Sequence, residues 1–317
     1  MDDSIKTYKC PNCGAALTFD SKTQKLHCSH CDTSIDVEAM KALSDTPSGT
    51  DQDNARWNTS DAGSNWSSSE QQGMRSYHCP TCGAELVTDE TTAASTCAYC
   101  GSPVVLSDHL SGAKRPNYVI PFKVDKKTAK ETLKNFYKGK IFLPRAFSAE
   151  NHLEEISGIY VPFWLYSCES KGSFSFDATR THHYTDGDYD VTETEHYLVL
   201  RDGEARFNNI PVDGSSKMDD AYMDAIEPFD YSAITDFHTD YLPGYAAQTY
   251  DEDATACAPR ATARVKNTTV AAIRRTCDYT TLTPRTSKIS TTQNSVDYAL
   301  LPVWMLTTNW HGKSYHF

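Results

Sequence analysis

Two stretches of sequence decide the fold: Cys10-Pro-Asn-Cys13 with Cys28-Ser-His-Cys31, and Cys79-Pro-Thr-Cys82 with Cys97-Ala-Tyr-Cys100. Fourteen residues separate the two Cys-x-x-Cys pairs of each quartet. Four thiolates at this spacing can surround one Zn²⁺ ion as a closed tetrahedral site. The sequence therefore predicts two zinc ribbons, each a small β-hairpin held by one structural zinc ion.

The residue that follows the second cysteine of a pair supports this prediction. Glycine stands there three times, as Gly14, Gly83 and Gly101, and Asp32 stands there once. A metal knuckle turns the chain with a positive φ at this position, which glycine adopts without strain and aspartate tolerates better than most residues. We expect a left-handed backbone at these positions.

Disulfide bonds are the alternative use of these cysteines. The N-terminus reads Met-Asp-Asp-Ser and lacks the basic and apolar regions of a signal peptide, so the sequence predicts a reducing, cytoplasmic compartment in which a metal is favoured. His27 and His30 lie beside cysteine ligands and are predicted to be solvated side chains. Three isolated cysteines are predicted to be buried free thiols: Cys168, Cys257 and Cys277.

The charge of the chain argues against a nucleic-acid partner. The formal net charge is −12, and the segment from Ser76 to Leu106 contains no lysine or arginine. A module that binds phosphates needs cations, because the release of counterions drives that binding. We therefore expect the second ribbon to contact protein or to play a structural role. No apolar run approaches the roughly 18–20 residues of a membrane-spanning helix.

The composition predicts a series of segments along the chain. They are zinc ribbon 1 (5–38), a polar linker (39–75), zinc ribbon 2 (76–107) and a mainly antiparallel α+β body (116–317). The linker assignment rests on its content of Ser, Asp, Thr, Asn, Gln and Gly. Trp57 and Trp66 are unusual in such a segment, and the sequence leaves open whether they dock on a folded neighbour.

The body contains a weak internal sequence repeat. Ile120-Pro121-Phe122 and Glu227-Pro228-Phe229 each precede a predicted helix, and Val161-Pro162-Phe163-Trp164 resembles Leu301-Pro302-Val303-Trp304. This pattern favours a duplicated α+β unit, with copies at 116–215 and 216–317. The alternative is that these prolines mark ordinary strand starts, where proline is tolerated.

Local patterns predict the elements of the body. Three helices are expected: one after Asp125 that ends at Gly139, one from Ser232 to about Pro243, and one over 258–276 with Ala261, Val265, Thr268 and Ala272 on one face. Two hairpins are expected: Ile159–Ser167 with Ser173–Thr181, and His196–Arg201 with Glu204–Ile210 around Asp202-Gly203.

Several motifs together resemble a known family. Beside the two cysteine quartets, they are Val119-Ile120-Pro121-Phe122-Lys123, Gly158-Ile159-Tyr160-Val161-Pro162-Phe163-Trp164, Ile210-Pro211-Val212-Asp213-Gly214-Ser215 and Leu301-Pro302-Val303-Trp304. With them the chain resembles bacterial zinc-ribbon proteins of the transcription factor IIB type, which are loosely labelled as relatives of the replication restart helicase. The resemblance implies eight zinc-ligating cysteines and no established activity. It also implies that the natural chain can continue past Phe317, which would make this the cytoplasmic part of a membrane-anchored protein.

The sequence contains no catalytic motif that withstands inspection. A P-loop fails because Thr307 stands where its first glycine belongs, and a calcium loop starting at Asp186 fails at Val191 and Tyr197. A polar hairpin loop is the better interpretation of 186–190. His182, His183 and His196 could bind a metal, but adjacent residues on a strand point to opposite faces, so only one of the first two could join the third. The sequence predicts no helicase or ATPase and leaves other enzyme activity open.

The predicted helix between Pro259 and Cys277 is strongly cationic. Its candidate anion-binding residues are Arg260, Arg264, Lys266, Arg274 and Arg275. The alternative is a solvated face that pairs with nearby acids such as Asp251-Glu252-Asp253. The leading hypothesis is a non-enzymatic scaffold with two structural zinc ions and a protein partner. The second hypothesis is a nucleic-acid accessory protein that uses this helix.

Overall fold

The computed structural model describes residues 8–10, 15–38, 40, 55–89, 96–107, 112–140, 142–144, 147, 153, 155–217, 220–310 and 313–316. The chain forms two compact units. Unit 1 comprises Met1–Asp53, Gly172–Gly203 and Ile273–Ile289, and unit 2 comprises Asn54–Lys171, Glu204–Ala272 and Ser290–Phe317. Helices and sheets are both present, so the predicted mixture of α and β structure is confirmed.

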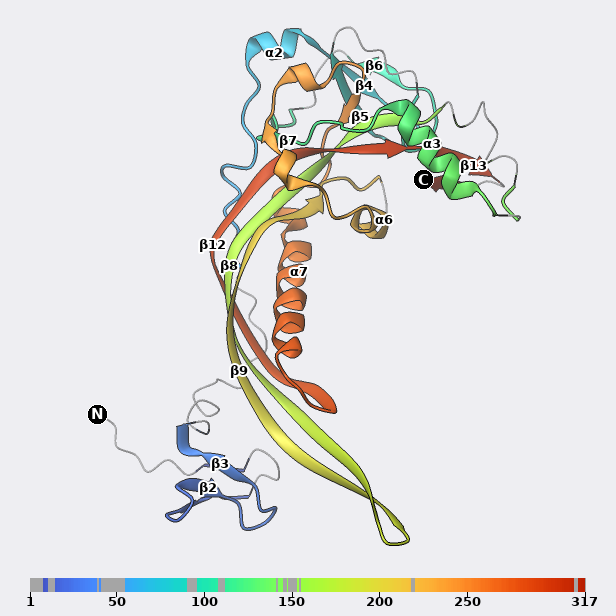
Figure 1. The fold of residues 1–317 in the computed structure, drawn as a ribbon. Coiled ribbons are helices and arrows are strands. Elements are labelled where there is room, and N and C mark those ends of the chain that lie inside the picture. The colour runs from blue at the N-terminus through green and yellow to red at the C-terminus, as the bar shows by residue number, and fades with distance from the viewer. Residues whose placement is uncertain are drawn as a thin grey trace. The chain divides into compact units, whose positions relative to one another are not determined.

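A nine-stranded sheet dominates the fold (Figure 1). Its order is β10-β7-β12-β8-β11-β5-β4-β6, and β9 pairs with β8 beside this path. The strands are β4 (Met74–His78), β5 (Glu85–Asp89), β6 (Val105–Ser107), β7 (Tyr118–Val119), β8 (Ser157–Asp186), β9 (Tyr189–Asp213), β10 (Thr235–Asp236), β11 (Ala246–Gln248) and β12 (Thr281–Met305). Two of the pairings, β11 with β8 and β12 with β7, are parallel, so the sheet is mixed and not purely antiparallel.

Two small sheets complete the β structure. The first contains β1 (Thr18–Asp20), β2 (Lys25–His27) and β3 (Ser34–Asp36), all antiparallel, as expected for the hairpin of ribbon 1. The second pairs β13 (Thr307–Trp310) with β14 (Lys313–His316) antiparallel. An antiparallel hairpin there agrees with the rejection of a P-loop, which requires a strand followed by a helix.

The prediction of a hairpin around 169–172 is wrong, because β8 runs unbroken through it. A Cβ at Gly172 would lie 2.5 Å from the ring of Phe174, so this glycine leaves room for the end of that side chain. The prediction of a turn at Asp202-Gly203 is also wrong, because β9 runs unbroken through these residues. A Cβ on Gly203 would lie 2.4 Å from Cδ1 of Ile273, so this glycine admits a side chain to the surface of β9. The chain does turn at Gly187, whose φ is 62°, as the predicted loop at 186–190 requires.

The helices are confirmed in part. α3 (Lys126–Tyr137) begins after Asp125, whose side chain accepts a hydrogen bond from the amide of Thr128. α7 (Ala254–Arg275) is the predicted cationic helix and begins four residues earlier than expected. Its buried face includes Ala261 and Val265 as predicted, but Thr269 takes the place of Thr268. The helix expected from Ser232 is wrong: short 3-10 turns at Tyr231–Ala233 and Thr239–Tyr241 flank β10 instead. α6 (Asp220–Ala225) was not predicted.

The second half of the predicted linker, residues 55–75, is folded within unit 2. The indole of Trp57 donates a hydrogen bond to Thr262 at 3.0 Å, and the indole of Trp66 donates to the carbonyl of Ala113 at 2.9 Å. The helix α2 (Ser68–Gln72) carries a capping box between Ser67 and Glu70. Both tryptophans therefore dock, because each ring is half-buried against unit 2 and its N–H group is satisfied.

The core of unit 2 lies on both faces of its sheet. One cluster contains Ile159, Phe163 and Leu301, and the other contains Tyr160, Trp164 and Tyr166 with the buried face of α7. Alternation along β8 explains this division, because successive side chains of a strand point to opposite faces. No helix among the described residues is both long and apolar enough to cross a membrane.

Candidate metal centre

The four sulfur atoms of the second cysteine group (Cys79, Cys82, Cys97 and Cys100) converge in unit 2. All four lie within 4.8 Å of one another. Sγ of Cys79 lies 3.5 Å from that of Cys100, and Sγ of Cys82 lies 3.6 Å from that of Cys97. A tetrahedral ion with metal–sulfur bonds of about 2.3 Å requires sulfur–sulfur edges of about 3.8 Å. The donor set and its spacing thus fit one tetrahedral metal ion.

Each half of this group is a knuckle with the same hydrogen bonds. The amide of Gly83 donates to the carbonyl of Cys79, and the amide of Gly101 donates to that of Cys97, both at 2.8 Å. The φ angles of Gly83 and Gly101 are 73° and 71°. The expected left-handed backbone at these two glycines is confirmed, and it explains why a residue without a Cβ follows each pair.

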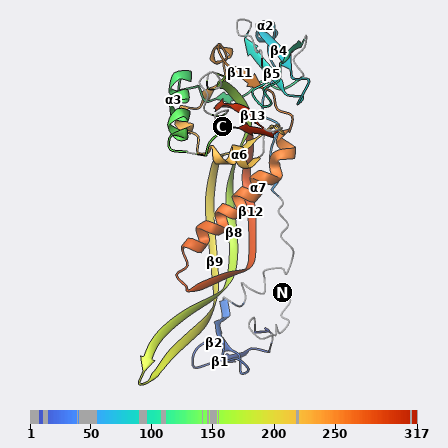
Figure 2. The ribbon, with the colours of Figure 1, turned by 90° about the vertical axis from the view of Figure 1, so that its right-hand side faces the viewer.

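The second cysteine group is part of the core of unit 2. Cys79 and Cys97 are buried in the cluster that contains Phe163 and Leu301. β4 leads directly into Cys79, and β5 pairs with both β4 and β11, so the strands beside this cysteine group continue the large sheet. Figure 2 shows β4, β5 and β11 together at this end of the sheet.

The electrostatics of the group favour a bound cation. Burial raises the pKa of Cys82 and of Cys97. Burial also acts to raise the pKa of Cys100, but hydrogen bonds from the side chain and backbone of Ser102 outweigh it and lower that pKa to about 7. Without a cation, four thiolates at this separation would repel one another. A divalent cation would remove that repulsion. Its positive charge would also compensate the negative charge of the buried thiolates.

Lys217 supplies a further positive charge from outside the ribbon. Its Nζ atom lies 3.9 Å from the position that a Cβ on Gly83 would occupy, and it forms an ion pair of 2.9 Å with Asp251. The hydrogen bond to Asp251 raises the pKa of Lys217, and the charges of Cys82 and Cys97 raise it further. Sequence reasoning missed this residue because it follows the ribbon by more than a hundred positions and no local pattern marks it.

The first cysteine group lies in unit 1 and is described in three of its four members. The sulfur atoms of Cys10, Cys28 and Cys31 lie within 4.8 Å of one another, and Cys13 lies outside the described residues. Asp32 has a φ of 55°, as expected after the second cysteine of a pair. The group therefore offers at least three thiols to one metal ion.

Comparison with known proteins places the chain in a family. Over 314 residues it is 35% identical to the uncharacterized protein YdjG of Bacillus subtilis (strain 168), a match that covers 99% of this chain and 86% of that relative. The chain belongs to the YdjG family. No family model matches the chain, and no solved structure matches it. Membership of the YdjG family carries no assigned activity, so the site itself must support any functional argument.

The other cysteines of this YdjG-family chain stand apart from both groups. Cys168 and Cys257 are buried, as predicted, and burial raises the pKa of each to about 11. Cys277 is only partly buried, so the prediction is wrong for this residue. It follows the last turn of α7, where its thiol contacts the carbonyl of Ile273 at 3.6 Å.

The histidines do not form a metal site within the described part of the chain. His27 contacts the hydroxyl of Ser34 at 3.3 Å, and His30 is exposed. His183 contacts Thr192 at 2.9 Å on one strand pair, while His182 lies 3.9 Å from a carboxylate oxygen of Glu195. Among the described residues, neither His27 and His30 nor the three histidines His182, His183 and His196 belong to a group of ligand atoms that could hold a metal ion.

Acidic side chains engage two of the cations on α7. Arg260 forms ion pairs with Asp213, Asp220 and Glu252. Arg264 forms ion pairs with Asp224 and Glu227. These carboxylates come from the end of β9, from α6 and from the loops beside α7. No local sequence pattern predicts that these segments lie close together. The predicted pairing with the upstream acids is thus present at Glu252.

The three other candidate cations differ in their surroundings. Arg274 and Arg275 are exposed in unit 1, and Arg274 donates a hydrogen bond of 3.1 Å to the carbonyl of Leu282. Lys266 is half-buried in unit 2. The five cations therefore differ in their exposure and their partners, and anion binding by any of them stays a prediction.

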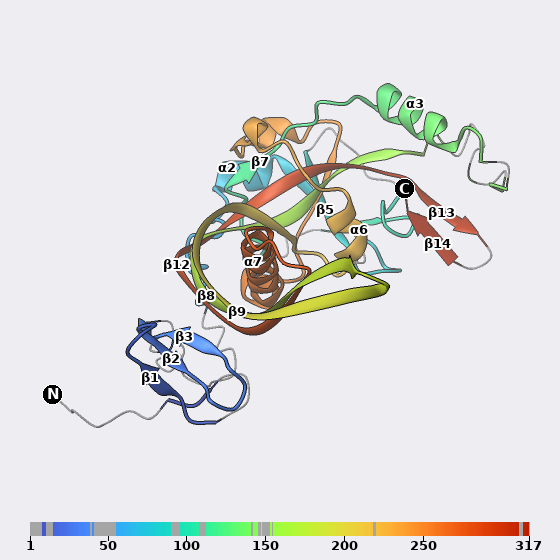
Figure 3. The ribbon, with the colours of Figure 1, turned by 60° about the horizontal axis from the view of Figure 1, so that its bottom comes forward.

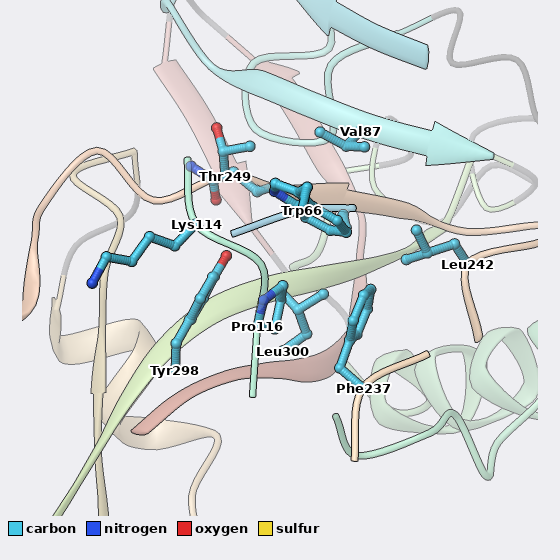
Figure 4. A pocket seen from close by; sticks show the side chains of 11 residues that line it. Trp66, Val87, Lys114, Pro116, Phe237, Leu242, Thr249, Tyr298 and Leu300 are labelled. Carbon is cyan, nitrogen blue, oxygen red and sulfur yellow. The ribbon is translucent and has the colours of Figure 1, made fainter. Parts of the chain in front are cut away.

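The small hollow of unit 2 in Figure 4 is apolar. Trp66, Phe237, Leu242, Tyr298 and Leu300 line it, and the ammonium group of Lys114, at its edge, donates to the carbonyl of Ala62 at 2.9 Å. It contains no pairing of nucleophile and base, nor any cluster of carboxylates. The hollow therefore fits the packing of Trp66 better than it fits catalysis.

Proposed function

We propose that this YdjG-family protein is a non-enzymatic scaffold that holds two structural zinc ions and binds another protein. The observation that carries the proposal is the second cysteine group, whose four thiols form a closed donor set inside the core of the large sheet. Both groups would be zinc ribbons of the transcription factor IIB type. The internal duplication remains a prediction.

Zinc is the metal that this donor chemistry favours. Four thiolates in a tetrahedron select zinc or iron, and zinc is the usual occupant of isolated Cys₄ ribbons. A catalytic zinc ion keeps one coordination position open for water or substrate, and four cysteines leave none. The same geometry supports a structural role over a catalytic one.

A scaffold role follows from how the second ribbon is built in. A ribbon that extends the sheet through β5 and β11 is held rigidly and presents a fixed surface. The ribbon itself has no lysine or arginine, so its surface suits a protein contact better than a phosphate backbone. Ion pairs at Arg260 and Arg264 also weaken the alternative of a nucleic-acid accessory protein that uses α7.

Elemental analysis of the purified chain tests the metal assignment. We expect about two zinc ions per chain, and about one for Cys97→Ser, because one lost thiolate opens the shell. Cys168→Ser is the matched control: it removes a buried thiol outside both groups and should retain both ions. Iron in place of zinc, or an unchanged content in Cys97→Ser, would contradict the assignment.

Binding assays test the scaffold role against the two alternatives. Turnover of a nucleotide, peptide or ester that a single substitution abolishes would overturn the non-enzymatic proposal. Salt-sensitive binding of DNA or RNA that falls in Arg274→Glu would favour the accessory role. Cross-linking of the intact protein in its native cell should instead capture a protein that contacts unit 2, and this contact should be lost when Cys97→Ser disrupts the ribbon.

A further inference from the structure

A second cationic surface lies on α3, where the sequence predicted only a helix. Residues 123–142 contain two acids, Asp125 and Glu131, and no arginine. They contain seven lysines, which we call the lysine surface: Lys123, Lys126, Lys127, Lys130, Lys134, Lys138 and Lys140. The local charge is therefore 7 − 2 = +5 in a chain whose formal net charge is −12.

The packing of α3 fixes which side faces outward. Ala129 and Tyr137 are buried in a cluster with Leu153, Ile156 and Leu306. The helix lies at the periphery of unit 2 (Figure 3). Because its apolar side is already covered by the protein, most of its lysines lie on the remaining surface: Lys126, Lys127, Lys138 and Lys140 are exposed, and Lys130 and Lys134 are half-buried. Lys123 is exposed but pairs with Asp230 at 2.6 Å.

Large apolar side chains protrude beside these lysines. Phe142 is 98% exposed, Phe136 is 55% exposed and Val124 is 43% exposed. The ammonium group of Lys140 lies 3.2 Å from the ring centroid of Phe136. Exposed phenylalanines cost free energy in water, so their position among cations suggests a partner that is anionic and apolar at once.

We propose that α3, together with Lys138, Lys140 and Phe142 after it, docks on the surface of an anionic phospholipid bilayer. The lysines contact the headgroup phosphates, and Phe136 and Phe142 enter the boundary between headgroups and acyl chains. Basic segments with exposed aromatic side chains bind such surfaces through both effects. The exposed phenylalanine rings argue against duplex nucleic acid, whose phosphate backbone offers them no apolar environment. The protruding rings also suit a soft interface better than a rigid protein surface.

Vesicle co-sedimentation of the full chain tests this proposal. We expect binding to vesicles of phosphatidylcholine with phosphatidylglycerol, loss of binding as salt rises, and little binding to phosphatidylcholine alone. Lys127→Glu/Lys138→Glu/Lys140→Glu should weaken binding by about 100-fold or more, given roughly fivefold per lysine. The control Lys22→Glu/Arg275→Glu/Lys288→Glu makes the same change in net charge at exposed cations of unit 1 and should bind as the parent does.

A fluorescent reporter tests insertion without depending on the charge variants. The emission of Phe142→Trp should shift to shorter wavelength when anionic vesicles are added, because the ring leaves water. Phe19→Trp, at an exposed position of the first ribbon, should show no shift. Absence of binding, equal loss in both triple variants, or equal binding to neutral vesicles would overturn the proposal. Binding of duplex DNA that displaces the vesicles would assign the lysine surface to nucleic acid instead.

Discussion

The phenol of Tyr99 donates a hydrogen bond to the side-chain oxygen of Gln248, and both residues are buried. Tyr99 lies between the last two ligands of the second cysteine group, whereas Gln248 lies in β11. The amide nitrogen of Gln248 then donates to the hydroxyl of Ser215 at 2.7 Å. A buried polar chain therefore ties the knuckle to the body of unit 2, and its members stabilise one another only while all are paired.

Replacement of Tyr99 by phenylalanine tests this chain of hydrogen bonds. We expect the free energy of unfolding to fall by about 1–3 kcal/mol, because the oxygen of Gln248 would stay buried without a donor. Urea denaturation of the metal-loaded protein measures the change, and the metal content should not alter. Tyr189→Phe, at an exposed position, should leave stability within about 0.5 kcal/mol of the parent. Equal stabilities of the two variants would contradict the finding.

Substitution of the knuckle glycine should weaken metal binding. Gly83 has a φ of 73°, which costs an L-residue about 1–2 kcal/mol. Gly83→Ala should therefore lose metal to a chelator at a lower concentration, by roughly an order of magnitude. Gly73→Ala is the matched control: its φ is −88° and its Cβ would meet only atoms 3.8 Å away or farther. If both variants retain metal alike, the left-handed turn does not matter for the site.

The cysteine groups could be predicted from sequence because their information is local. The spacing within each quartet and the residue after each pair place the ligands and the turns without knowledge of the rest of the chain. Confirmation at Gly83, Gly101 and Asp32 reflects this local control. The hydrogen bond from Tyr99 to Gln248 joins residues 149 positions apart, and no local sequence pattern predicts it.

The full length of β8 and β9 could not be predicted, because glycine can mark either a turn or a close contact within a strand. At Gly172 and Gly203 it admits a neighbouring side chain, whereas at Gly187 it allows a positive φ. Sequence alone does not distinguish these cases, since the deciding atoms belong to Phe174 and Ile273, which a pattern of residues does not place. The charges on α7 illustrate the same limit, because their acidic partners come from three other segments.

The docking of Trp66 should be essential to the stability of unit 2. Its ring contacts that of Phe237 edge-on at 5.7 Å between centroids, and its N–H is satisfied by Ala113. Trp66→Ala should reduce the free energy of unfolding by about 2–3 kcal/mol and should speed proteolysis within residues 55–75. Tyr222→Ala, at an exposed site, serves as the control. Unchanged proteolysis of Trp66→Ala would indicate that the segment does not depend on this ring.

The buried carboxyl of Asp213 should make stability depend on pH. Burial raises its pKa to about 6, although Arg260 opposes that shift, and Asp220, Glu252 and the thiol of Cys257 also surround it. Protonation of Asp213 therefore stabilises the folded state fully below about pH 4, and this contribution is lost as the pH rises through about 6.

Asp213→Asn isolates this effect. The stability difference between parent and variant should change by up to about 3 kcal/mol between pH 4 and pH 7, since each pKa unit corresponds to about 1.4 kcal/mol. The parent should gain relative stability toward the acidic end. Parallel denaturant titrations at several pH values measure it, with Asp188→Asn in the exposed turn as the control. A difference that stays constant with pH would refute the assignment.

The pairing of β5 with β11 has a consequence for the metal-free protein. β11 is a strand of three residues whose outer backbone groups are covered only because β4, β5 and β6 continue the sheet past it. If the knuckles were unloaded and these strands released, Ala247 and Gln248 would present an open edge, which is the usual template for pairing between chains. A metal ion in the second cysteine group would therefore keep this edge covered, and its loss would open the edge to pairing between chains.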